Sequence, residues 1–181
     1  MRKLRRKRRA LITFPSPRFA GEVVDPTSGG SYPVAMDAEF DRDIDVAKVG
    51  KVMLAAPLTV ALGVRLVDVV AAKVTLEAPW REDLVGDAER GTISGGVVTA
   101  LIDHACAATI ASIKRGGAPT LDLRVDYMRA AAPKSGVVCE AHCYKLTRTI
   151  AFVRAVAWDV DRDDPVATAL ATFAVPEPRP A

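Results

Sequence analysis

The segment from Gly91 to Ile113 constrains the fold of this chain more than any other stretch. After Gly95 and Gly96, small apolar residues continue from Val97 to Ile113, about five turns of a helix, and Asp103 is the only acid among them. These apolar residues occur nearly all round the predicted helix, which therefore has no polar face to turn to solvent. We predict a buried helix whose single carboxylate needs either a partner or a chemical role.

The same segment does not fit a membrane span. From Val97 to Ile113 the helix would rise about 25 Å, less than a bilayer core, and Asp103 and His104 oppose insertion. A secretory signal is not indicated either, because the run ALITF after the basic N-terminus is short and Pro15 and Pro17 interrupt it. We expect a cytoplasmic protein with no membrane span.

The charge is unevenly distributed along the chain. Of 25 Lys and Arg residues, seven lie in MRKLRRKRR at the N-terminus, which leaves 18 against 22 Asp and Glu in the remainder, a net charge of −4. A nucleic-acid-binding domain needs cations over a folded face. We therefore predict no nucleic-acid partner for the body of the protein.

Length and local composition predict the domain organisation. The 181 residues, 50% of them hydrophobic, suffice for one domain with a good core. Residues 1–38 are rich in Pro and Gly and are interpreted as a basic, flexible arm, residues 39–176 as one domain and residues 177–181 as a tail. The arm has other interpretations: a polybasic anchor, a targeting segment, or an extension upstream of a functional start at Met36.

The cysteines and histidines do not suggest a metal site. Cys106, Cys139 and Cys143 form an odd set without a disulfide-dense pattern, which favours a reducing compartment. His104 and His142 complete no set of ligands with zinc spacing.

Local patterns predict the remaining elements. Before the central helix we expect a helix over 41–56, a short helix over Pro57–Leu62 ended by Gly63, a hairpin of Val64–Val70 and Lys73–Ala78, and a loop over Pro79–Arg90. The central helix should end near Lys114 to Gly117. Four strands should follow: Thr120–Met128, Val137–Leu146, Thr149–Asp159 and Val166–Val175.

These elements specify an α+β fold. In the first strand after the helix, Leu121, Leu123, Val125 and Tyr127 alternate strictly with polar or charged residues and Met128. Short connections favour consecutive antiparallel hairpins, and one apolar helix is buried only if the sheet curls around it. We predict an antiparallel sheet of five to six strands wrapped around one long central helix.

At this level of detail the chain closely resembles a known family. The chain is similar to hot-dog-fold thioesterases of the phenylacetic-acid-degradation type from about Ala56 to Phe173. Three sequence motifs carry the similarity: GTISGG, which precedes the helix with Asp103; TLDLRVDYMRAA; and LTRTIAFVRAVAW. The resemblance implies hydrolysis of acyl-coenzyme A (acyl-CoA) without metal or organic cofactor. It also implies homodimers, often paired into tetramers, with active sites across the dimer interface.

The resemblance also implies roles for individual residues. The catalytic acid of the family falls on Asp103, the oxyanion-binding amide on Gly95, and the polar residue that assists the acid or its water on Thr120. Two positions that we expect to contact substrate, Ser94 and Asp87, depart from the family pattern. Ser94 replaces a histidine before the two glycines, and Asp87 replaces an asparagine in the preceding loop, where its charge could repel Asp103.

The residues themselves support part of this chemistry. Uncovered N–H groups at a glycine-rich helix start suit an oxyanion, and Gly96 and Ser94 would border it. Gly95 and Asp103 lie about 12 Å apart along a helix, so a site that uses both needs two chains. Asp103 would act as a general base on water or as a nucleophile, and both remain open.

Further residues and other functions fit parts of the pattern. Arg129, Lys145 and Arg148 are candidates to bind the phosphates of coenzyme A (CoA). A proton relay of Ser94, Asp103 and His104 is disfavoured because the side chains of adjacent helical residues diverge by about 100° and the motif G-x-S-x-G is absent.

The expected function is hydrolysis of an aromatic or medium-chain acyl-CoA. The alternatives are a 3-hydroxyacyl-thioester hydratase or dehydratase, which needs a histidine paired with the acid, and a non-catalytic acyl-CoA-binding protein.

Overall fold

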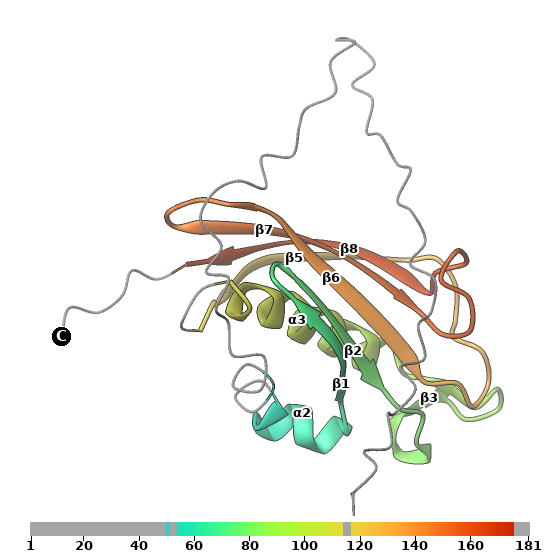
Figure 1. Ribbon diagram of the computed structural model, residues 1–181. Coiled ribbons are helices and arrows are strands. Elements are labelled where there is room, and N and C mark those ends of the chain that lie inside the picture. The colour runs from blue at the N-terminus through green and yellow to red at the C-terminus, as the bar shows by residue number, and fades with distance from the viewer. Residues whose placement is uncertain (1–49, 51–53, 114–116, 176–181) are drawn as a thin grey trace, which may run out of the picture. The chain divides into compact units, whose positions relative to one another are not determined.

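The computed structural model describes residues 50, 54–113 and 117–175 (Figure 1). The predicted arm, most of the helix expected over 41–56 and the predicted tail lie outside these residues. The elements are α2 (Pro57–Leu62), β1 (Arg65–Val70), β2 (Lys73–Ala78), the 3-10 helix η1 (Glu82–Leu84), β3 (Val85–Asp87), β4 (Thr92–Ile93), α3 (Gly95–Ala111), β5 (Thr120–Tyr127), β6 (Val137–Leu146), β7 (Ile150–Trp158) and β8 (Ala167–Ala174).

Six strands form one antiparallel sheet in the order β1-β2-β6-β7-β8-β5. The long helix α3 lies along one face of this sheet (Figure 1). Residues on the sheet side of α3, such as Leu101, Ile102 and Ala105, are fully buried with the inward side chains of β2, β6 and β7. The predicted α+β architecture of a sheet around one central helix is confirmed.

The first half of the fold contains the predicted α2 and β1-β2 hairpin, and it adds the 3-10 helix η1 and the small β3-β4 hairpin. Gly63 ends α2 with a positive φ of 68°, and β1 and β2 form the expected hairpin around Ala72. The segment expected to be a loop over Pro79–Arg90 instead contains η1 and β3, which pairs with β4. The loop prediction was wrong there because Ser94 N donates to Leu84 O across this small hairpin.

The prediction of consecutive hairpins holds for β6, β7 and β8 but was wrong for β5. That strand pairs with β8 and forms an edge of the sheet. The connection from β5 to β6 is too long for a hairpin turn. Ala132, in this connection, donates its backbone N–H to Asp159 at the end of β7. The connection therefore crosses from one side of the β6-β7-β8 meander to the other.

The central helix differs from its prediction at its start and in its exposure. It begins at Gly95 rather than Val97, because the Ser94 side chain and carbonyl cap the first turn. It is also not buried all round. Its face away from the core is partly or fully exposed and carries small or polar side chains at Gly95, Gly96, Thr99, Ala100, Asp103, His104, Ala107 and Ala111.

Candidate active site

Asp103 lies on the partly exposed face of α3 and is held by Thr120 from the first position of β5. The Thr120 hydroxyl donates to Asp103 Oδ1 at 2.8 Å. One carboxylate oxygen is thus fixed by a neighbouring element, whereas the side chain keeps access to solvent on the helix face. An oriented and accessible carboxylate can accept a proton from water or attack an electrophile.

A β-bulge explains how Thr120 reaches the helix. Thr120 pairs with Phe173 and Asp122 with Thr172, so the register shifts by one residue between them. Strict alternation would place Thr120 on the same face as Asp122. The extra residue turns Thr120 toward α3 instead, on the side of Leu123 and Val125, which pack partly buried against the core. The predicted strict alternation was therefore wrong at this end of the strand.

Ser94 caps the N-terminus of α3. Its hydroxyl oxygen accepts from Gly96 N at 3.3 Å, and its carbonyl accepts from Val97 N and Val98 N. Gly95 N belongs to the first turn, where amides have no acceptor within the helix, and Gly95 is exposed. Partial positive charge at this exposed helix end suits a negatively charged oxygen.

Tyr127 and Thr99 also meet at this helix end, although no sequence motif marks either of them. Tyr127 Oη donates to Gly95 O at 2.6 Å and lies 2.5 Å from Thr99 Oγ1, which itself donates to Gly95 O at 3.1 Å. The alternating pattern predicts that Tyr127 lies on the apolar face of its strand, but it does not predict the partner of the hydroxyl. Its hydroxyl would need a polar partner, but that partner lies 32 residues away in the chain and is found only once strand and helix are placed together.

Asp87 is the last residue of β3, where the chain turns toward β4. Its Oδ1 accepts from the backbone N–H groups of Glu89 and Arg90 at 3.1 Å each, and its Oδ2 lies 3.6 Å from Arg90 Nη1. Within one chain this carboxylate therefore shapes its own turn. Its predicted contact with substrate stays a prediction.

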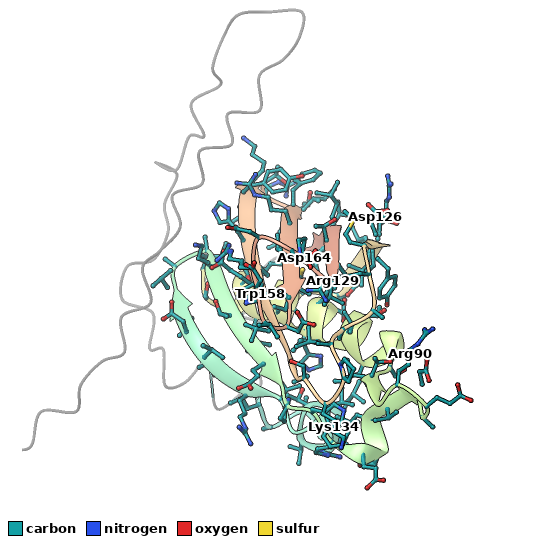
Figure 2. All side chains as sticks on the ribbon, turned by 90° about the vertical axis from the view of Figure 1, so that its right-hand side faces the viewer. Arg90, Asp126, Arg129, Lys134, Trp158 and Asp164 are labelled. Carbon is teal, nitrogen blue, oxygen red and sulfur yellow. The ribbon has the colours of Figure 1, made fainter. Side chains whose placement is uncertain are left out.

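Arg129 is engaged by two aspartates. Its guanidinium donates to both carboxylate oxygens of Asp159, at 2.6 and 2.9 Å, and its Nε lies 2.8 Å from Asp164 Oδ2 (Figure 2). The Asp159 side chain is 1% exposed, and its hydrogen bonds from Arg129 hold the pKa of its carboxyl well below the ordinary value. Two carboxylates already neutralise Arg129, which disfavours its predicted role in phosphate binding.

The other cations proposed for CoA lie at the far end of the β6-β7 hairpin. Lys145 and Arg148 are both exposed, on β6 and in the turn that follows it. Their predicted contact with phosphate stays a prediction.

The two histidines of the chain have separate surroundings. His104 Nε2 makes a short hydrogen bond with the buried hydroxyl of Thr59 on α2. His142 lies on β6 between Glu140 and Tyr144, on the sheet face opposite the buried Cys139, Ala141 and Cys143. Burial, with Arg154 and Lys73 nearby, lowers the pKa of His142. Neither histidine is placed as a partner of Asp103 in a proton relay.

Two global properties bear on the site. In the described part of the chain, no group of three or more His, Cys, Asp or Glu side chains is arranged to hold a metal ion. Nor does any helix of those residues have the length and apolar character needed to cross a membrane.

Comparison with known proteins finds a family similarity over the segment that carries these residues. The family model described as "Thioesterase superfamily" matches residues 90–166, which include Gly95, Asp103 and Thr120. The chain has the hot-dog fold, and its residues 90–166 are similar to the thioesterase superfamily. No functionally curated protein matches it significantly.

Solved structures show the same fold. A Pseudomonas aeruginosa protein is 29% identical, with a TM-score of 0.66 over 72% of this chain and 98% of its own. A variant of the phenylacetic acid degradation protein PaaI from Thermus thermophilus is 28% identical, with a TM-score of 0.58 over 65% and 97%. Thioesterase superfamily member 2 from Mus musculus, at 21% identity and a TM-score of 0.63 over 72% and 96%, supports the fold alone.

Proposed function

We propose that this protein hydrolyses an acyl-CoA thioester, with an aromatic or medium-chain acyl group, to the free acid and CoA. The observation that carries this proposal is the hydrogen bond of Thr120 to Asp103 on the accessible face of α3, in a fold of the thioesterase superfamily. On the partly exposed face of α3, Ala100 and Ala107 lie about one turn to either side of Asp103, and these small apolar side chains suit an apolar acyl group.

Each proposed catalytic residue has a distinct task. Asp103 takes a proton from water as it attacks the carbonyl carbon, or attacks that carbon itself to form an anhydride that water then opens. The N–H of Gly95 donates to the carbonyl oxygen as negative charge develops there. The C–S bond breaks, and the thiolate of CoA leaves and is protonated. Thr120 holds one oxygen of Asp103, which leaves the other free for the reaction.

We propose that two chains form each site. Gly95 and Asp103 of one helix are separated by about 12 Å, so one carbonyl cannot meet both within a chain. The edge strand β5 and the adjacent face of α3 support such pairing. On β5 and just after it, Leu121, Tyr127 and Met128 are 59%, 50% and 59% exposed, while the helix face carries only small or polar side chains that permit close approach.

The same geometry disfavours a 3-hydroxyacyl-thioester hydratase. Such a site needs a histidine paired with the acid, whereas His104 bonds with Thr59 and His142 lies on the sheet face away from α3. A non-catalytic acyl-CoA-binding protein remains the competing proposal, since Ser94 stands where the resembling enzymes carry histidine. Ser94 nevertheless retains the capping contact that fixes the helix start.

The test is steady-state release of free thiol from a panel of aromatic and aliphatic acyl-CoA compounds. Asp103→Asn, which keeps the shape of the side chain, should lower kcat by about a thousandfold or more, because it removes the base or nucleophile. Binding of CoA to the same variant, measured by calorimetry, should persist. Thiol release that is absent from wild type, or equal in wild type and Asp103→Asn, would contradict the proposed function.

A further inference from the structure

The carbonyl oxygen of Gly91 accepts two hydrogen bonds from distant parts of the chain. The indole Nε1 of Trp80 donates to it at 2.9 Å, and the backbone N–H of Lys134 donates to it at 3.0 Å. The N–H of Gly91 donates to Asp87 O at 2.8 Å, and the φ of Gly91 is 66°, a conformation that favours glycine. Both backbone polar groups of Gly91 are therefore fixed.

The segment that provides Lys134 is itself braced at both ends. At one end, Ala132 N and Arg129 donate to the buried carboxylate of Asp159. At the other end, a Cβ on Gly136 would lie 2.8 Å from Ala78 O and 3.1 Å from Trp80 N, so the two backbones are in close contact. Residues 129–136 thus form a brace, with Arg129 and Lys134 labelled in Figure 2.

From Gly91 the chain runs directly to the start of α3. Only β4 and Ser94 separate Gly91 from Gly95, and Ser94 N donates to Leu84 O. A displacement of Gly91 would therefore be passed through a short, hydrogen-bonded segment to the Gly95 amide. Trp80 is the side-chain donor to the Gly91 carbonyl, since the donor from Lys134 is a backbone group.

We propose that Trp80 is a positioning residue for the Gly95 amide, acting through the Gly91 carbonyl. This inference rests on the proposed function for its catalytic consequence, but its physical content is the immobilisation of residues 91–95. The indole donates to Gly91 rather than to Gly95 or Asp103. Its effect should therefore appear in the geometry of the helix start and in kcat rather than in substrate affinity.

The test compares three variants in the full chain. Trp80→Phe keeps an aromatic ring and removes the donor. Trp80→His restores a donor, because the five-membered rings of His and Trp superpose with Nε2 in the place of Nε1, and it is assayed at pH 8, where the imidazole is neutral. Trp158→Phe is the matched control. Trp158 lies on β7, where the Arg162 guanidinium carbon is 4.9 Å from the centroid of the Trp158 ring. Figure 2 shows Trp158 well apart from Lys134.

Hydrogen–deuterium exchange is read on peptides that cover residues 91–98 and, as an internal reference, residues 137–146. Trp80→Phe should exchange faster over 91–98 alone, Trp80→His should restore slow exchange, and Trp158→Phe should match wild type in 91–98. In the thiol-release assay, Trp80→Phe should lower kcat about 3- to 10-fold with KM unchanged, the loss expected for one hydrogen bond that acts on the transition state.

Two exchange results would overturn the inference: wild-type exchange over 91–98 in Trp80→Phe, or faster exchange over both peptides, which would make Trp80 a determinant of global stability. A rise in KM at constant kcat would also overturn it. If wild type hydrolyses no thioester, the proposed function fails by itself, and the exchange experiment still decides whether Trp80 fixes the helix start.

Discussion

At the scale of single residues, substitution of Thr120 tests directly whether its hydrogen bond orients the Asp103 carboxylate for catalysis. Its hydroxyl donates to Asp103 Oδ1 at 2.8 Å. Thr120→Val keeps the shape and removes the donor, so we expect kcat to fall roughly tenfold, the value of a hydrogen bond to a charged group. Thr120→Ser keeps the donor and is the control. Equal kcat for the Val and Ser variants in thiol release would show that this hydrogen bond does not assist catalysis.

His142 gives a residue-scale prediction for stability. It is half-buried on the outer sheet face, directly opposite Lys73 on β2 and Arg154 on β7, and Glu140 lies two residues earlier on its own strand. Burial is the main cause that lowers the pKa of His142. The unfolded chain, with a histidine pKa of about 6.5, therefore binds more protons near that pH than the folded chain. The stability contribution is complete above about pH 6.5 and is lost as the pH falls below it.

Urea unfolding of wild type and His142→Gln at pH 8 and pH 5 checks this sign. Wild type should lose more stability than His142→Gln between these values, because glutamine has no proton to bind. A parallel loss in both proteins would assign the acid sensitivity to other groups.

At the scale of elements, Asp159 connects the end of β7 to the segment that follows β5. It accepts from Arg129, Ala132 N and Val160 N, and these hydrogen bonds lower the pKa of its carboxyl. Asp159→Asn should cost about 2–4 kcal/mol of unfolding free energy at pH 7, because it leaves Arg129 without its main partner. The loss should shrink as the pH falls below about 4, where the unfolded aspartate is protonated.

Asp161→Asn, in the same turn, is the control for that experiment. Its Oδ1 accepts from Asp163 N, a role that an asparagine oxygen can take over. Denaturant midpoints of the two variants should therefore differ, and equal midpoints would contradict the assigned role of Asp159.

The small hairpin of β3 and β4 is held against the start of α3 by Gly86. A Cβ at this position would lie 2.8 Å from Ser94 Cα, a backbone atom that cannot move away cheaply. Gly86→Ala should lower stability by about 1–3 kcal/mol through overpacking. Gly117→Ala, where a Cβ would meet nothing within 4 Å, is the control in thermal unfolding. An unchanged Tm for Gly86→Ala would mean that the hairpin and the helix start move independently.

At the scale of the whole molecule, the proposed pairing of two chains has its own test. Leu121 on the edge strand is 59% exposed, so Leu121→Lys should leave the folded chain stable but oppose pairing through that edge. We expect a shift from dimer to monomer in sedimentation velocity, together with loss of thiol release. Val160→Lys, at a position 80% exposed in the turn after β7, should change neither. A dimeric and active Leu121→Lys protein would place the interface elsewhere.

The sequence by itself determined the α+β architecture and singled out Asp103 as the candidate acid. Apolar periodicity distinguished helix from strand, and only a curled sheet could cover so apolar a helix as α3. Asp103 stood out because a lone carboxylate in such a segment is costly without a role. Gly63 and the hairpin of β1 and β2 were equally local features, fixed by backbone freedom and alternation.

Only the tertiary structure decided which distant groups meet. The bulge that turns Thr120 toward Asp103, the pairing of β5 with β8, and the contacts of Tyr127 and Trp80 with backbone carbonyls join residues far apart in the chain. It also assigned Arg129 to Asp159 instead of leaving it to solvent. Periodicity reports whether a residue is turned inward, whereas a hydrogen bond depends on register and on the course of connections, which a local pattern does not encode.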